Sequence, residues 1–217
     1  MKNLFLLILL GFSLSSCMTN LSMQTGRTLE QGEVQVTAGS TNIGAYKNES
    51  TKSNQTQTET NLSSLDPGTT FGRLKVGVGN NTDVGLTLGF SSVLSGSIEG
   101  EVKHQFIGNK NDLFAVSAGL KIGLAGALGL GSINYTIPIY ASIHPTEYVS
   151  FYTSPRFKSV SFTEILGGTS STNFFGLVNG LNLSYSSIDL YFEHSLLFHK
   201  EAMNDRGQLN AGIAFRF

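Results

Sequence analysis

The stretch QLNAGIAFRF, residues 208–217, alternates between two kinds of side chain at every position. Its odd-numbered residues are apolar and end in two phenylalanines, whereas its even-numbered residues are polar, small or, at Arg216, charged. A period of two is that of a β-strand, in which successive side chains point to opposite faces. One face of this strand therefore favours hydrocarbon, and the other favours a polar interior.

The same alternation recurs from residue 33 onward, interrupted by clusters of Gly, Asn, Asp, Pro and Ser. It predicts an all-β fold, a transmembrane antiparallel up-and-down β-barrel of about ten strands over residues 33–217. Eight or twelve strands would need only one hairpin to be reassigned. The expected strands are 33–43, 70–79, 84–94, 97–107, 113–127, 132–144, 148–162, 174–185, 188–199 and 208–217.

The connections between these strands differ in length. We expect short turns at 80–83, 108–112, 145–147 and 186–187, and longer loops at 44–69, 163–173 and 200–207. Short periplasmic turns and longer outer loops are typical of bacterial barrels. The pattern therefore predicts that both barrel termini are periplasmic.

Composition excludes several classes of protein. Hydrophobic residues make up 40% of the chain, yet no stretch after the amino terminus approaches the roughly 18 apolar residues of a helical membrane span. Charged residues are 13%, and the net charge of −1 gives no sign of a nucleic-acid partner. One cysteine and four scattered histidines suggest neither an internal disulfide nor a metal site, and no cofactor is expected.

Residues 1–16 have the pattern of a secretory signal peptide: Lys2, an apolar run over 4–10 and a small-residue exit. The ending Leu14-Ser15-Ser16-Cys17 resembles a bacterial lipobox, which implies that Cys17 receives a diacylglycerol and becomes the new amino terminus. The alternative is an ordinary signal peptide and a free thiol. With lipidation, residues 17–32 form a lipidated polar tether between the lipid and the barrel.

A last strand that closes on a carboxyl-terminal phenylalanine resembles the outer-membrane β-barrel proteins of Gram-negative-type bacteria. The resemblance implies that the outer-membrane insertion machinery recognises Ile213, Phe215 and Phe217. The expected partners are therefore membrane lipid, this machinery and the lipoprotein-processing enzymes that act on Cys17. The resemblance predicts an address in the bacterial outer membrane and says almost nothing about activity.

Most charges within the expected strands fall on the face opposite the apolar rows. They are Glu33, Arg73, Lys75, Glu99, Glu101, Lys103, Lys121, Arg156, Lys158, Asp189, Glu193 and Arg216. Mixed signs in a narrow lumen would pair across strands, because an unpaired buried charge costs several kcal/mol. They predict a plug of ion pairs and hydrogen bonds in a barrel too narrow to conduct.

Three functions remain open besides envelope structure. The polar loop 44–69 suits surface interaction with an extracellular ligand. Arg73, Lys75, Arg156 and Lys158 would suit a small anion-preferring pore. The alternation also fits a soluble lipocalin-like periplasmic lipoprotein, in which the apolar rows would line an interior cavity for an apolar ligand.

Enzymatic function is not expected. Lipid A deacylases carry a His and a Ser two residues apart on one strand, whereas His194 and Ser195 are adjacent and point to opposite faces. Omptin proteases use acidic residues and a His at the outer rim. His199, Glu201 and Asp205 gather near one outer loop, and Asp66 lies in another, but no paired acidic motif accompanies them. His104 and His194 fall on the lipid face, and for His194 we suspect a register error.

Overall fold

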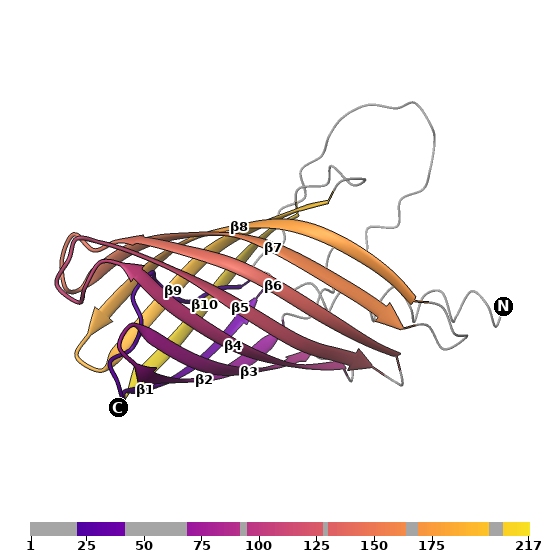
Figure 1. Cartoon of the computed structure of the whole chain (residues 1–217), viewed down its shortest axis with the longest axis horizontal. Coiled ribbons are helices and arrows are strands. Elements are labelled where there is room, and N and C mark those ends of the chain that lie inside the picture. The colour runs from indigo at the N-terminus through magenta and orange to yellow at the C-terminus, as the bar shows by residue number, and fades with distance from the viewer. Residues whose placement is uncertain (1–20, 42–68, 92–94, 128–129, 164–168, 200–205) are drawn as a thin grey trace, which may run out of the picture.

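A computed structural model describes residues 21–41, 69–91, 95–127, 130–163, 169–199 and 206–217 (Figure 1). These residues form ten β-strands and, within the described ranges, no helix. The strands are β1 Val34–Thr41, β2 Thr70–Gly79, β3 Thr82–Ser91, β4 Ser95–Ile107, β5 Phe114–Ala127, β6 Leu130–Ile143, β7 Val149–Thr163, β8 Thr169–Tyr185, β9 Ile188–His199 and β10 Arg206–Arg216.

Each strand pairs antiparallel with its neighbours in sequence, and β1 pairs with β10 to close the barrel. The closing register places Val36 opposite Phe215 and Ala38 opposite Ile213. The backbone of Val34 and that of Phe217 exchange two hydrogen bonds of 3.1 and 2.9 Å. Closure leaves no free sheet edge, and the predicted ten-strand antiparallel barrel is confirmed.

The four turns named above as short, at 80–83, 108–112, 145–147 and 186–187, lie at one end of the barrel, together with the carboxyl terminus (Figure 1). Two of them contain only two residues, and each places one residue in the left-handed region, Asn81 at φ 62° and Ser186 at φ 54°. This backbone matches the twist of a tight β-hairpin. We call this the short-turn end and the opposite one the long-loop end.

Several predicted boundaries were wrong. Strands β4, β6 and β10 each begin two residues earlier than expected, at Ser95, Leu130 and Arg206. Strand β3 begins at Thr82 rather than residue 84, so the preceding turn is shorter than expected. Strand β8 begins at Thr169 rather than residue 174, which shortens the expected loop 163–173 to residues 164–168. Almost all of the expected loops 44–69 and 200–207 lies outside the described residues.

The outer face of the barrel is apolar and the inner face is polar. Val102, Ile137 and Phe151 are 53–54% exposed on the outside, and similar side chains recur on the other strands. A continuous apolar surface of this kind is unstable in water and suits lipid. A lipocalin-like cup needs the opposite arrangement, with an apolar cavity, so that hypothesis is wrong.

Aromatic side chains mark the short-turn end of the outer face. Tyr148, Tyr185 and Phe217 are 52%, 76% and 79% exposed there. Aromatic rings at such a level are typical of the boundary between hydrocarbon and lipid head groups.

The two histidines expected on the lipid face are both exposed there. His104 contacts Thr82 on the neighbouring strand, with 2.8 Å between its Nδ1 and the hydroxyl oxygen. His194 pairs with Asn179 on β8 and Leu209 on β10. The suspected register error at His194 was therefore wrong. Among the described residues, no helix is long and apolar enough to cross a membrane.

Candidate functional site

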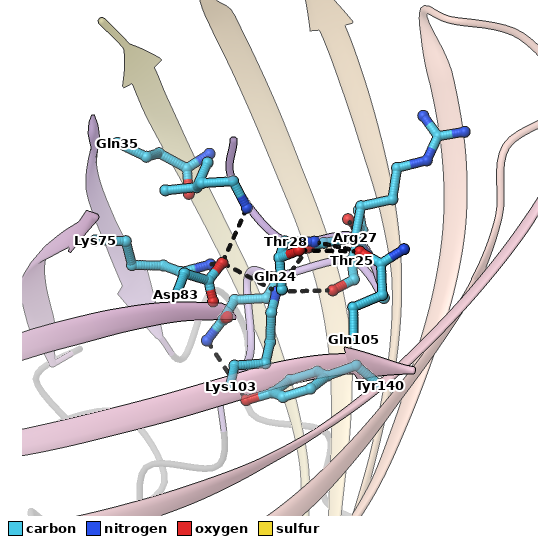
Figure 2. A network of polar contacts seen from close by, with 12 residues as sticks. Gln24, Thr25, Arg27, Thr28, Gln35, Lys75, Asp83, Lys103, Gln105 and Tyr140 are labelled. Carbon is cyan, nitrogen blue, oxygen red and sulfur yellow. Dashed lines mark hydrogen bonds and ion pairs between the residues drawn. The ribbon is translucent and has the colours of Figure 1, made fainter. Parts of the chain in front are cut away.

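Residues 21–31, which we call the luminal segment, lie inside the barrel rather than forming a simple tether ahead of it. Its first four residues, Leu21 to Gln24, are at most 8% exposed. The segment reaches the short-turn end at Gly32, whose amide donates to the carbonyl of Gly77 at 2.8 Å. Figure 2 shows its central part among side chains of the barrel wall. The chain therefore runs through the lumen toward the short-turn end, where it reverses direction and continues as β1.

Two arginines from opposite walls bind the start of the luminal segment. Arg156 on β7 donates from Nη1 to the carbonyl oxygen of Leu21 at 2.8 Å. Arg73 on β2 donates from Nη1 to the carbonyl oxygen of Ser22 at 2.6 Å. Strands β2 and β7 are five positions apart in the ring of ten, so the two guanidinium groups reach this peptide from opposite sides.

One carboxylate binds the next two amides. Glu193 on β9 accepts a hydrogen bond from the amide of Ser22 at 3.0 Å and another from the amide of Met23. The hydroxyl of Tyr152 also donates to Glu193, at 2.9 Å. Met23 has φ 44°, so its backbone lies in the left-handed region. This uncommon conformation turns two successive amides toward one anion, which is how backbone nests bind anions.

A second carboxylate holds the side chain of Gln24. Glu101 on β4 accepts hydrogen bonds from Gln24 Nε2 and from the Tyr140 hydroxyl, each at 2.6 Å. Lys121 on β5 pairs with Glu99 at 3.1 Å and with Glu101 at 3.6 Å. Glu101 is therefore bound by groups from the wall and from the luminal segment.

Asp83 binds the part of the luminal segment that lies nearer the short-turn end. Its carboxylate pairs with Lys75 at 2.9 Å and with Lys103 at 3.7 Å, and it accepts the Leu29 amide at 3.1 Å (Figure 2). Its side chain is fully buried. The sequence prediction had placed Asp83 in a turn and missed it, although alternation with Val84 on the outer face would have directed it inward.

Polar groups of β4 bind the backbone between these two carboxylates. Lys103 donates from Nζ to the carbonyl oxygen of Arg27 at 2.7 Å and to that of Thr25 at 3.3 Å. Gln105 accepts the Thr28 amide at 2.8 Å (Figure 2). In this part of the segment, as at Leu21 and Ser22, cationic side chains donate hydrogen bonds to backbone carbonyl groups.

Two glycines let the luminal segment approach the wall closely. A Cβ atom on Gly26 would clash with the carbonyl oxygen of Ala115. A Cβ atom on Gly212 of β10 would clash with the sulfur of Met23, whose side chain is fully buried. These contacts set the register of the segment, because a shift by one residue would bring a side chain to the position of Gly26.

A further ionic group lies at the short-turn end, close to where the barrel closes. Asp189 pairs with Arg216 Nε at 3.0 Å and accepts from Gln35 Nε2 at 3.1 Å. Arg216 Nη1 lies 3.9 Å from Glu33. These residues join β1, β9 and β10 across the closing seam.

The structure places all twelve charges named from the sequence on the luminal side. Nine are at most 5% exposed: Arg73, Lys75, Glu101, Lys103, Lys121, Arg156, Lys158, Asp189 and Glu193. The other three, Glu33, Glu99 and Arg216, are half-buried. The lumen is thus densely charged, with both signs interspersed.

The remaining residues named from the sequence lie elsewhere. Ile213, Phe215 and Phe217 alternate with the inward residues of β10, and Phe215 and Phe217 are exposed on the outer face. Cys17, the proposed lipid attachment point, lies outside the described residues, as do Asp66, Glu201 and Asp205.

The geometry does not assemble the hydrolase site considered from the sequence. His194 points outward, whereas Ser195 is buried and accepts from Asn210 at 3.3 Å. Another Ser–His contact does exist, because His144 lies 2.7 Å from the hydroxyls of both Ser142 and Ser150. No group of three or more metal-binding side chains occurs in the described ranges.

His144 is a poor candidate for a general base. Burial, together with the positive charge of Arg27, lowers the pKa of His144 to about 4. Both ring nitrogens already contact serine hydroxyls, so no carboxylate orients the ring as a catalytic triad requires. This cluster is therefore part of the polar interior.

The luminal segment separates two hollows. The one toward the long-loop end has a volume of about 40 Å³, and Leu21 and Arg156 are among the residues that line it. The other, toward the short-turn end, has a volume of about 630 Å³ and is lined by Gln24, Lys103 and Glu33 among others. The chain occupies the centre of the lumen, where a continuous pore would have to run.

No family model and no curated protein matches this sequence. Among solved structures, the NanC porin is 11% identical, with a TM-score of 0.50 over 84% of this chain and 98% of that chain. The N-terminal β-barrel domain of Pseudomonas aeruginosa OprF is 9% identical, with a TM-score of 0.38 over 87% and 100% of the two chains. Ail of Yersinia pestis is 11% identical, with a TM-score of 0.37 over 86% and 99%. The chain has the fold of a bacterial outer-membrane β-barrel protein.

Proposed function

We propose that this chain is a non-catalytic outer-membrane β-barrel whose lumen is closed by its own amino-terminal segment. One observation carries the proposal: side chains from the wall bind the backbone of residues 21–29 along the length of the lumen. Such a barrel serves as a rigid membrane scaffold for its outer loops. The role is envelope structure, or surface interaction with an extracellular ligand through the loop 44–69.

Energetics support a closed state. Withdrawing the luminal segment would leave buried carboxylates, arginines and lysines without the backbone groups that they now bind. Each buried group left unsatisfied costs about 1–3 kcal/mol, and more when it is charged. Because many such contacts would be lost together, withdrawing the segment from the lumen would cost a large amount of free energy.

We also propose that Cys17 carries a lipid and that the short-turn end is periplasmic. Val34 and Phe217, the two ends of the barrel, already lie together at that end.

Conductance of the refolded full-length protein in a planar bilayer tests the closed lumen. We expect no stable current steps from the native sequence. A double substitution, Arg73→Ala with Arg156→Ala, should produce steps because it releases the start of the segment. Stable steps from the native protein would overturn the closed lumen.

A small anion-preferring pore is the second candidate. The observation that favours it is the lining of the hollow toward the long-loop end, which includes Arg73, Arg156 and Lys158. If native protein conducts, the reversal potential in a salt gradient decides between the candidates, because this lining predicts selectivity for chloride over potassium.

A further inference from the structure

Three polar side chains interrupt the apolar outer face of the barrel on adjacent strands. They are Thr153 on β7, Asn179 on β8 and His194 on β9, and these strands lie side by side in the wall (Figure 1). Thr153 is directly opposite Asn179 in the pairing of β7 with β8, and Asn179 is directly opposite His194 in the pairing of β8 with β9. The three residues therefore form one continuous row, which we call the outer polar row.

The outer polar row lies at the depth of the hydrocarbon rather than at either boundary. Along β8, Asn179 is midway between Tyr185 at the short-turn end and Asn173 toward the long-loop end, and both of these are exposed. Each member of the row has apolar outward residues on both sides of it in its own strand: Val149, Phe151, Pro155 and Phe157 on β7, Phe175, Leu177, Leu181 and Leu183 on β8, and Leu190, Phe192, Leu196 and Phe198 on β9. An apolar band of this kind, about 25 Å tall in bacterial barrels, faces the lipid chains.

Polar groups at this depth are costly when they face only lipid, because lipid chains offer no hydrogen bonds. The outward residues of β5 from Phe114 to Leu124, and those of β6 from Ile133 to Ile143, include no Thr, Asn or His. His104, which also points outward, lies near the short-turn end and contacts the hydroxyl of Thr82. The outer polar row differs from both cases, since it combines polar side chains with a position in the middle of the apolar band.

The hydrogen-bonding groups of the row are only partly used within the barrel. Thr153 donates from its hydroxyl to Asn179 Oδ1 at 2.9 Å, which leaves this oxygen a second lone pair. The side-chain amide of Asn179 donates to none of the described residues. The ring of His194 leans toward Gly207 on β10, where a Cβ atom would lie 3.0 Å from Nε2. The row therefore presents both donors and acceptors to the outside of the barrel.

The central residue of the row is complementary to itself. A primary amide supplies both an N–H donor and a carbonyl acceptor, so two of them can form a pair of N–H···O bonds. Two barrels inserted in the same direction form a closed symmetric pair about a two-fold axis along the membrane normal. An axis beside Asn179 brings the two Asn179 amides together and places Thr153 and His194 of both copies around them.

We propose that the outer face of β7, β8 and β9 is the interface of a homodimer in the membrane, in which the two Asn179 amides hydrogen-bond to each other across a two-fold axis. The apolar residues around the row pack against their counterparts and exclude lipid from the polar centre. Apolar contacts alone favour association little in a membrane, because lipid is equally apolar, whereas polar side chains that hydrogen-bond between the two copies do favour it. The interface lies outside the barrel, so it holds whether or not the lumen conducts.

Sedimentation equilibrium of the refolded full-length protein in density-matched detergent micelles measures the association. We expect a reversible equilibrium between a monomer of 23.3 kDa and a dimer, with the dimer favoured as the ratio of protein to detergent rises. A monomer at every ratio would overturn the interface, and so would an assembly larger than a dimer, because a two-fold contact closes with two copies.

Replacement of the central amide tests the hydrogen bonds. Asn179→Leu should raise the dissociation constant of the dimer about tenfold or more, because two hydrogen bonds within the membrane are lost. Leucine suits a lipid-facing position, so the variant should fold, which heat-modifiable gel mobility verifies. His104→Leu is the matched control, since it makes the same kind of change on the outer face of β4, and it should leave the dissociation constant unchanged. If Asn179→Leu behaves like this control, the amides do not pair.

A second pair of variants tests the location of the interface and leaves every polar group in place. Leu181→Trp adds a bulky ring next to Asn179 on the outer face of β8 and should also weaken the dimer about tenfold or more. Val102→Trp adds the same ring to the outer face of β4 and should leave the dissociation constant unchanged. Weakening by Val102→Trp but not by Leu181→Trp would place the contact on another face of the barrel and refute the proposal.

Discussion

Substitution of Glu193 by alanine removes the anion that holds the start of the luminal segment. Three donors would lose their acceptor: the amides of Ser22 and Met23 and the hydroxyl of Tyr152. Hydrogen bonds to a charged group contribute about 1.5–3 kcal/mol each, and an unsatisfied buried donor costs about 1–3 kcal/mol. Because the three share one acceptor, their losses do not add, and we expect the free energy of unfolding to fall by about 3–5 kcal/mol.

Urea unfolding in lipid vesicles measures this change, with the folded fraction read from heat-modifiable mobility on gels. Glu193→Gln retains one acceptor oxygen in nearly the same shape, so it should cost about half as much as Glu193→Ala. Glu147→Ala is the control, since Glu147 is exposed in the β6–β7 turn, and it should change stability by less than about 0.5 kcal/mol. If Glu193→Ala behaves like the control, the luminal segment does not stabilise the barrel.

Four other changes follow from the same structure. Gly26→Ala should lower the free energy of unfolding by about 1–3 kcal/mol in the same assay, because its Cβ would clash with the wall, and an unchanged midpoint would contradict the close approach. Asp83→Asn should lower the free energy of unfolding by about 3–5 kcal/mol, because two buried lysines lose the carboxylate that they bind. If Glu at this position restores stability and Gln does not, the effect comes from the charge rather than from the shape of the side chain. Val102→Arg should cost about 2–4 kcal/mol in vesicles if the outer face of β4 meets hydrocarbon, whereas a cost near zero would place β4 outside the membrane. His144 stays neutral in the folded protein down to about pH 4, while the unfolded chain takes up the proton near pH 6.5. Stability should therefore fall as the pH is lowered from 6.5 to 4, and His144→Gln should remove that dependence.

Alternation along the sequence was sufficient to predict the barrel because lipid and lumen impose opposite demands on neighbouring residues. A shift of one residue in any strand would turn its inward-facing polar or charged residues toward hydrocarbon, so the alternation in the sequence specifies the register directly. His194 illustrates the strength of this rule. Its polarity suggested an error, yet the pairing with Leu209 keeps it on the outer face.

Local chemistry was less reliable at the strand ends. The sequence Asn80-Asn81-Thr82-Asp83 contains typical turn residues, which led to the prediction of a four-residue turn. The barrel needs only Asn80 and Asn81 for the reversal, and Asp83 is drawn inside by Lys75 and Lys103. Lys75 and Lys103, on the strands that flank β3, both point into the lumen, and two such lysines indicate that a carboxylate lies between them. Identifying Asp83 as that carboxylate required the register of β2, β3 and β4.

The luminal segment was not predictable for a different reason. The wall recognises mainly its backbone, and every residue has a backbone, so binding leaves no pattern in the identity of residues 21–31. The exceptions include Gly26, where a side chain does not fit, Gln24, whose amide reaches Glu101, and Met23, whose sulfur packs against Gly212. Such positions are too few to distinguish a bound segment from a polar linker.

The number of strands explains why the lumen needs an occupant, and the occupant explains the mixture of charges. Eight strands give an interior that side chains alone can fill, and ten strands give a wider one. A polypeptide passing through it presents carbonyl acceptors and amide donors in equal numbers. The wall meets the carbonyls with Arg73, Arg156 and Lys103 and the amides with Glu193 and Asp83. A lumen lined mainly by charges of one sign would suit the passage of ions. An enclosed peptide instead requires both cationic and anionic side chains along the barrel, because it presents both carbonyl and amide groups.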